Sequence, residues 1–333
     1  MTHWLTLPKV ELHCHLLGVI NPALLTRIRR DGGTILVEPK TLEAAYPVSD
    51  LEAFRRWVAM LKPYQAATLE VMRPLLAAHV ANLIAQHVVY AEIMLSPTMF
   101  PRQLPALLAA FHRWREWAFE LEQGRIQIEF IMVVPRTLDP DVLECDTATF
   151  IALQREGLIV GVALVGVETG ESIQGYASSF RRWREVGLGI EIHAGEHSGP
   201  ASIWDALEHG RPARLGHGLS AFQDRALLDY IRRHNVHLEF CPTSNLRTGA
   251  VQNIAQHPIG RAREWGLSFS LNTDDPGAFE CSLQDEYQLV AEAFAFNAAD
   301  FMAVFRHALA ARFQPQLRYL PNTSDSFQGW NPV

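Results

Sequence analysis

Short apolar runs alternate with segments of helical periodicity along the chain. The runs are rich in β-branched and aromatic residues, and nearly continuous apolar runs are typical of parallel strands buried on both faces. Eight such runs lie at residues 9–13, 88–95, 126–134, 158–165, 189–193, 214–217, 236–240 and 267–271. Helix-like segments between them include 22–30, 104–121, 178–186, 224–234 and 259–265. Eightfold strand–helix alternation predicts an α/β fold, a (β/α)8 TIM barrel built by one domain over residues 1–333.

The stretch from residue 31 to residue 64 is too long for a simple loop after the first strand. Ser49-Asp50 supplies a helix N-cap, and apolar residues follow at helical spacing. This apolar stripe consists of Leu51, Phe54, Trp57, Val58 and Leu61. It can pack on the barrel, and it can also form a helical lid insertion over the catalytic face; both can hold at once. The C-terminal tail, 315–333, is expected to carry no chemistry.

The net charge of the chain argues against one class of binding partner. A formal net charge of −7 leaves no basic stripe to neutralise phosphates, so we expect no nucleic-acid partner. The only lysines are Lys9, Lys40 and Lys62. After Lys62 there is therefore no lysine for a Schiff base, a P-loop or a carboxylated-lysine bridge between two metals. A metal site in this chain is expected to hold one ion.

The cysteines and the hydropathy of the chain indicate the cellular compartment in which the protein works. The four cysteines are scattered without a C-x-x-C pair, as expected of free thiols in a reducing compartment. The N-terminus shows no secretory signal, and polar residues interrupt the most apolar stretch, 71–95, so we expect no membrane partner. These features predict a cytoplasmic protein, and they leave its oligomeric state open.

Two histidines at the end of the first predicted strand are candidate metal ligands. Side chains alternate between the two faces of a strand, so His13 and His15 would point into the barrel while Cys14 points towards the helices. Two imidazoles from one strand end suit a zinc site. The H-x-H pattern alone is weak, because a chain with 14 histidines can contain it by chance.

Residues that follow later strands strengthen this interpretation. His193 ends the fifth predicted strand, and Asp274 follows the eighth, which adjoins the first in a closed barrel. Three neutral imidazoles and one carboxylate leave a divalent ion enough Lewis acidity to lower the pKa of a bound water to about 7. Glu196 and His217 lie at the same mouth and can move protons. Each could be an ordinary loop or strand-end residue, but together they predict a mononuclear metal hydrolase.

With these residues the chain resembles the adenosine deaminase family of the amidohydrolase superfamily. The matching stretches span most of the chain in family order, one after each of most predicted strands. They are 7–18, Tyr90-Ala-Glu-Ile with Ser96-Pro97, Gly161 with Gly166-Val-Glu168, His193-Ala-Gly-Glu196, Arg214-Leu-Gly-His-Gly218, Pro242-Thr-Ser-Asn245 and Asn272-Thr-Asp-Asp-Pro276.

The resemblance implies roles for the site residues and a reaction. It implies one zinc ion (Zn2+) per chain, held by His13, His15, His193 and Asp274. It further implies that Glu196 protonates the ring nitrogen next to the attacked carbon, while His217 orients the attacking water and helps to take its proton. Asp275 and the backbone N–H of Gly166 would bind the two halves of a purine. The implied reaction is hydrolytic release of ammonia from an adenine-type amino-purine.

Three departures from the family pattern concern the substrate. Leu17 stands where an acidic residue usually meets the ribose 5′-hydroxyl, Ala163 replaces the usual Asp of the fourth-strand motif, and Met94 replaces the usual Arg before Ser-Pro. The side chain of leucine cannot accept a hydrogen bond from this hydroxyl. A site with leucine here therefore has a much weaker preference for a hydroxylated substrate. We predict a nucleoside with an apolar 5′ substituent or a free base. Adenosine is the alternative if another residue supplies the bond.

Two other classes of function stay open at this point. One is a different mononuclear hydrolase of the superfamily, acting on an amide, a lactone or a non-purine aminated heterocycle. Glu196 and Asp275 argue against it because both suit a purine ring. The other is a catalytically silent ligand-binding protein, against which the intact ligand set and proton-transfer residues argue. His237-Leu-Glu239 matches the H-x-E of cytidine-deaminase zinc sites, but the required C-x-x-C is absent.

Overall fold

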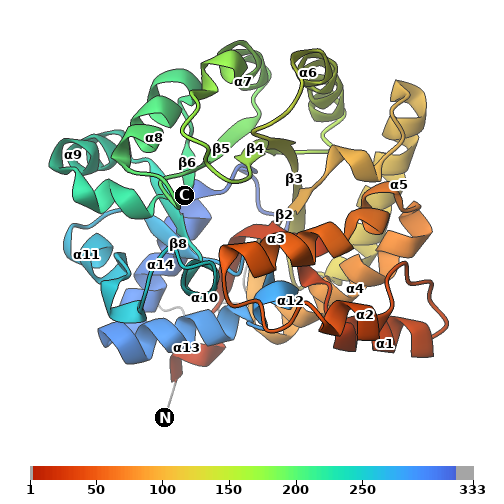
Figure 1. Ribbon diagram of the computed structural model, residues 1–333, viewed down its shortest axis with the longest axis horizontal. Helices are drawn as coiled ribbons and strands as arrows, with labels where there is room; N and C mark the ends of the chain where they lie inside the picture. Colours follow the sequence, from red (N-terminus) through yellow and green to blue (C-terminus); the bar gives the residue numbers. More distant parts are fainter. Residues whose placement is uncertain (1–2, 320–333) are drawn as a thin grey trace.

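The computed structural model of the protein describes residues 3–319. Its strands form one eight-stranded sheet in which every strand is parallel to its neighbour and the strand order follows the chain. Figure 1 shows the strands at the centre with helices around them. The strands are β1 Lys9–His15, β2 Val88–Leu95, β3 Gln127–Pro135, β4 Gly161–Val165, β5 Gly189–Ala194, β6 Arg214–His217, β7 His237–Phe240 and β8 Phe269–Leu271.

The first and last strands meet and close the sheet into a barrel. The backbone N–H of His15 donates to the carbonyl of Asp274 at 2.9 Å, and the N–H of Asp274 donates to the carbonyl of His13 at 3.0 Å. Cys14 and Asp274 form a parallel bridge between the two chain segments. The predicted (β/α)8 barrel is confirmed. Its closure brings the first and last motifs of the sequence together.

Helices cover the outside of the barrel between successive strands. Several begin at side-chain caps: Asp50 accepts from the N–H of Ala53 at 2.7 Å, as predicted, and Asp224 caps α9. The helices are α1 Pro22–Arg30, α2 Pro39–Glu43, α3 Leu51–Met60, α4 Leu69–Ala85, α5 Leu104–Glu122, α6 Pro140–Arg155, α7 Ala177–Glu185, α8 Pro200–Asp205, α9 Arg225–His234, α10 Pro242–Arg247, α11 Ile259–Glu264, α12 Pro276–Phe279, α13 Leu283–Phe294 and α14 Ala298–Ala311.

Five strands differ in length from their predictions: β5 and β7 by one residue, β1 and β8 by two, and β4 by three. β1 runs two residues further than predicted, to His15, because the backbone N–H of that residue pairs with Asp274 across the closure. β4 begins at Gly161 rather than at residue 158. Leu158 and Ile159 bury their side chains before the strand begins, so their apolar character reflects packing rather than strand pairing.

The interior of the barrel is more polar than the apolar runs indicate. Seven charged side chains within the strands are buried, with at most 1% of each residue exposed: Lys9, Glu11, Glu92, Glu129, Glu191, Arg214 and Glu239. Buried charges are stable only when they are paired. Arg214 supplies such pairing, because its guanidinium lies 2.6 Å from carboxylate oxygens of both Glu92 and Glu239.

The apolar stripe of the 31–64 insertion packs on the barrel, which is one of the two roles predicted for it. Trp57 is buried, and its indole N–H donates to the hydroxyl of Tyr46 at 3.1 Å. The ring of Phe54 stacks on Phe279 of α12, with 5.2 Å between the ring centroids. Figure 1 accordingly shows α3 in front of the barrel, beside α12.

The state of the cysteines and the apolarity of the helices can be seen in residues 3–319. The four cysteines are all free thiols, as predicted. In this described part of the chain, no helix combines the length and apolarity that crossing a bilayer requires. Of the predicted tail, residues 315–319 are described, and residues 320–333 lie outside the described part.

Candidate active site

The four predicted metal ligands meet at the carboxyl end of the barrel. Ligand atoms of His13, His15 and His193 lie within 4.8 Å of one another. Oδ1 of Asp274 is 3.5 Å from Nε2 of His13 and 3.5 Å from Nε2 of His15. In a tetrahedral zinc site with bonds of about 2.0–2.1 Å, ligand atoms stand about 3.3–3.4 Å apart. The Nε2 atoms of His13 and His193 are buried without a hydrogen-bond partner. The four residues therefore fit a single metal ion.

A glycine and an unusual backbone conformation give the side chains of this cluster their positions. A Cβ at Gly216 would lie 2.8 Å from the ring of His193 and 3.0 Å from that of His13, so glycine leaves the room that both imidazoles occupy. Asp274 has a left-handed φ of 61°, which is uncommon for a residue with a side chain and frequent at functional sites. Its Oδ2 accepts a hydrogen bond from Ser244 at 2.7 Å. That bond leaves Oδ1 facing the histidines.

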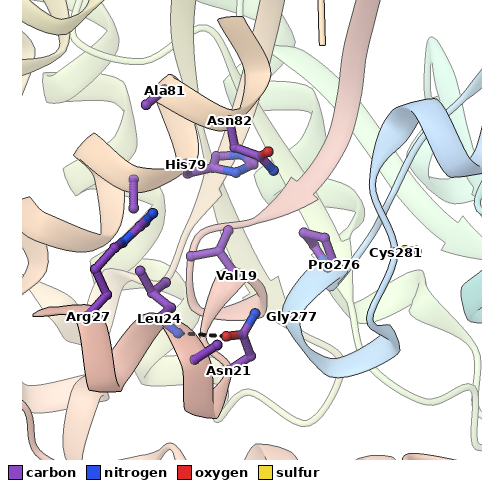
Figure 2. Close-up of a pocket in the computed structure, with 12 residues that line it drawn as sticks. Val19, Asn21, Leu24, Arg27, His79, Ala81, Asn82, Pro276, Gly277 and Cys281 are labelled. Atoms are coloured by element: carbon purple, nitrogen blue, oxygen red, sulfur yellow. Dashed lines mark hydrogen bonds between the residues drawn. The ribbon is translucent and has the colours of Figure 1, made fainter. Parts of the chain in front are cut away.

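Cys14, between the two ligand histidines of β1, contacts an outer helix as predicted. Its sulfur lies 3.4 Å from Nε2 of His79 on α4. His79 lines a separate cavity of about 560 Å³ between α1, α4 and α12, shown in Figure 2. The alternation along β1 thus places the two histidines inside the barrel and the thiol outside.

A cavity of about 420 Å³ opens beside the histidine cluster. Eight of the nine predicted site residues line it; His13 lies deeper, fully buried. The eight are Leu17, His15, Gly166, His193, Glu196, His217, Asp274 and Asp275. The same cavity is lined by all five residues of the apolar stripe, so α3 both packs on the barrel and forms a cavity wall. That α3 moves as a lid stays a prediction.

Glu196 and His217 lie next to each other at the edge of the cluster. Nε2 of His217 is 3.5 Å from Oε2 of Glu196. The side-chain amide of Asn245 donates to Oε1 of Glu196 at 3.3 Å and lies 3.1 Å from Nδ1 of His217. Asn245 ends the Pro242-Thr-Ser-Asn245 stretch, to which the sequence alone gave no role. Its amide fixes the relative positions of the two predicted proton-transfer groups.

The surroundings of these two groups set their charge states. Burial raises the pKa of Glu196 to about 8, and the negative Asp274 and Glu168 act in the same direction. Burial lowers the pKa of His217 to about 3, with the neighbouring His13 contributing. At neutral pH a protonated carboxyl then lies beside a neutral imidazole. This arrangement suits a general acid next to a proton acceptor.

Asp275 and Gly166, the predicted ring-binding residues, line the same cavity. A Cβ at Gly18 would lie 2.2 Å from Oδ1 of Asp275, so the glycine that ends the 7–18 stretch is required by the position of this carboxyl. Burial, and then the negative Asp274, raise the pKa of Asp275 well above its ordinary value. A protonated carboxyl can donate a hydrogen bond to an aromatic ring nitrogen.

Glu168 anchors the loop that carries Glu196, a role that sequence reasoning missed. Its carboxylate accepts hydrogen bonds from the backbone N–H groups of four consecutive residues, Gly195 to Ser198, at 2.6, 2.9, 2.9 and 3.2 Å. The hydroxyl of Ser202 also donates to it. The sequence showed Glu168 only as part of a family stretch, because its backbone partners lie 27 to 30 residues further along the chain.

We expect Glu168→Gln to lower kcat while metal binding and folding persist. An amide side chain would turn an NH2 group towards N–H donors, which displaces the loop. A displacement of about 1 Å can cost about 10²-fold in rate. Steady-state kinetics would measure the effect, and Glu171→Gln, the same change at an exposed position of the same segment, is the control. Equal kcat values for the two variants would disprove the anchoring role.

The comparisons with known proteins give the family. The profile of the adenosine deaminase family matches residues 8–319. The chain belongs to the adenosine deaminase family. It is 34% identical over 318 residues to an adenine deaminase of Sinorhizobium medicae, covering 92% of this chain and 94% of that protein. An adenine deaminase of Agrobacterium fabrum is 32% identical over 309 residues, covering 92% and 93%. The protein is a hydrolytic deaminase.

Solved structures share the fold. An adenine deaminase from Arthrobacter aurescens superposes with a TM-score of 0.79 at 23% identity, covering 92% of this chain and 94% of that one. A zinc-bound amidohydrolase from Burkholderia ambifaria superposes with a TM-score of 0.80 at 21% identity, covering 93% and 87%. At these identities the likeness shows the barrel fold.

Proposed function

We propose that this protein releases ammonia from the free base adenine, using one zinc ion per chain. The observation that carries the proposal is the arrangement around one cavity of the histidine–aspartate cluster, two proton-transfer groups and a carboxyl suited to a purine ring nitrogen. The identity of 34% to an adenine deaminase over nearly the whole chain supports the substrate.

Each residue of the site has a task in this reaction. The four predicted ligands would hold the zinc, which would supply the Lewis acidity that lowers the pKa of a water to about 7. Glu196 donates a proton to the ring nitrogen next to the amine-bearing carbon, which makes that carbon electrophilic. His217 orients the water and accepts its proton. Asp275 and Gly166 bind the ring, and the products are ammonia and the 6-oxopurine.

The far wall of the cavity favours a base over its nucleoside. Leu17 lines the cavity where the family's acidic residue would meet a ribose hydroxyl, and Phe54 and Trp57 of α3 add apolar surface. Apolar surface of this kind stabilises a bound ligand by about 25 cal/mol per Å² that it covers. A ribose hydroxyl placed against this apolar surface loses its hydrogen bonds with water and finds no partner to replace them.

A panel of three substrates tests the substrate proposal. The values of kcat/KM for adenine, adenosine and 5′-deoxy-5′-methylthioadenosine are compared by ammonia release. We expect adenine to have the highest value. A preference for adenosine would overturn the proposal, and a preference for the methylthio compound would keep the apolar wall while moving the substrate to a modified nucleoside.

Leu17→Asp is expected to shift the ratio of kcat/KM towards adenosine. The new carboxylate can accept a bond from the ribose hydroxyl, and such charged hydrogen bonds contribute about 1.5–3 kcal/mol, or about 10- to 100-fold. Leu104→Asp, which adds the same charge at an exposed site on α5, is the control. If the two variants show the same adenosine-to-adenine ratio, Leu17 does not select the substrate.

We also propose that the ligand is a small aminated heterocycle rather than a nucleic acid, and that the protein acts in the cytoplasm. The net charge of −7 supports the first statement, and four free thiols support the second.

A further inference from the structure

The chain turns into the amino-terminal end of the barrel after α14. Phe313 sits there, and the glycines of two strands leave space for its ring: a Cβ at Gly161 would lie 2.4 Å from the ring, and a Cβ at Gly189 would lie 2.1 Å from it. Phe313 also packs against a cluster of buried side chains from three strands, which consists of Met94, Ile131, Val133 and Ala163. Phe313 therefore forms the floor of the barrel.

The floor contacts the buried cation of the barrel. The guanidinium carbon of Arg214 lies 3.5 Å from the centroid of the Phe313 ring. Arg214 also donates to the carbonyl of Ala311 at 3.3 Å, while the N–H of Phe313 donates to Glu92 at 2.7 Å. A guanidinium stacked on an aromatic face gains most when the pair is desolvated, and Arg214 is fully buried.

Arg214 in turn determines where two carboxylates lie. Its Nε is 2.6 Å from Glu239, and its second terminal nitrogen is 3.5 Å from Glu191. Both carboxylates lie 3.0 Å from Nδ1 of His13. The two carboxylates repel each other, and without Arg214 their burial would be costly. Their position beside the histidine thus depends on the arginine.

We propose that Phe313 and Arg214 are positioning residues that hold His13 in the orientation that metal binding requires. The chain of contacts runs from the floor through Arg214 to Glu239 and Glu191, and from these to Nδ1 of His13, which leaves Nε2 free to face the metal. The inference rests on the zinc site of the proposed function. It gives the segment after α14 a role in the metal centre at the opposite end of the barrel.

The test measures the zinc dissociation constant by chelator competition together with the unfolding midpoint of the metal-free protein. Phe313→Leu keeps most of the apolar volume but removes the aromatic face. We expect zinc binding to weaken by about 10–100-fold, the usual cost of losing a residue that orients a ligand. Arg214→Lys, which lacks the planar fork, is expected to weaken it similarly. Phe313→Tyr, which restores the aromatic face, is expected to restore affinity.

Matched variants distinguish an effect on the orientation of His13 from an effect on the stability of the whole protein. Phe294→Leu makes the same change on α13, outside the barrel, and is expected to lower the unfolding midpoint without changing zinc affinity. Zinc affinity of Phe313→Leu and Arg214→Lys within about twofold of Phe294→Leu would overturn the inference, since orienting residues cost more than that. His13→Ala distinguishes the two proposals. If this variant keeps the zinc, the metal site itself is wrong; if it loses zinc while Phe313→Leu does not, only the positioning role fails.

Discussion

Replacing His13 by alanine, or Asp274 by alanine, is expected to release the metal and to remove nearly all deaminase activity. The two side chains lie 3.5 Å apart, with Nε2 of His13 buried and unpartnered. Removing a residue that only orients a ligand already costs about 10–100-fold in affinity, so loss of a ligand itself costs more. Elemental analysis of the purified variants and an ammonia-release assay measure the two effects.

A buried histidine outside the cluster is the control for this prediction. His79 is 3% exposed and lines the cavity between α1 and α4. His79→Ala should lower stability, as loss of a buried side chain does, but leave one zinc per chain. Two metal ions per active wild-type chain, or full activity of the metal-free protein, would contradict the proposed centre.

Replacing Glu196 by glutamine is expected to lower kcat by roughly 10²–10⁴-fold, the usual contribution of a proton-transfer group. The amide cannot donate the acidic proton to the ring. It keeps the size of the side chain, and Glu196 is not one of the four cluster residues, so zinc content and the unfolding midpoint should stay those of the wild type.

Glu208→Gln, an exposed position beyond α8, is the control for the loss of one carboxylate and should keep full kcat. Retention of more than about a tenth of wild-type kcat by Glu196→Gln would exclude it as the general acid, because that role contributes at least about 10²-fold. A normal kcat with a raised KM would point instead to a role in binding.

Most of the barrel could be predicted because its signals are local. Each strand is a short apolar run, and the strand–helix alternation repeats eight times, which leaves few other topologies. The predicted N-cap Asp50 begins α3 for the same reason, since capping involves neighbouring residues only. The errors lie at strand ends. Leu158 and Ile159 are buried before β4 begins, and an apolar pattern does not distinguish packing from strand pairing.

The predicted site residues meet around one cavity, but the residues that support them were missed. Glu191 stands two residues before His193 in β5, and Glu239 stands two residues after His237 in β7. This alternation of polar residues was the only signal of their inward position. Glu168 was visible in the sequence only as a member of a family stretch. Its task depends on four N–H groups of another loop.

The sequence by itself determined the fold class, the residue types at the mouth of the barrel, and the face of β1 on which His13 and Cys14 lie. These follow from periodicity and from motifs that stand directly after strands. Only the tertiary structure decided which groups become partners. His13 and Glu239 are 226 residues apart, and Phe313 and Glu92 are 221 apart. Such contacts depend on strand register and on closure of the barrel, and no local pattern encodes either, because both arise only when distant segments pack together.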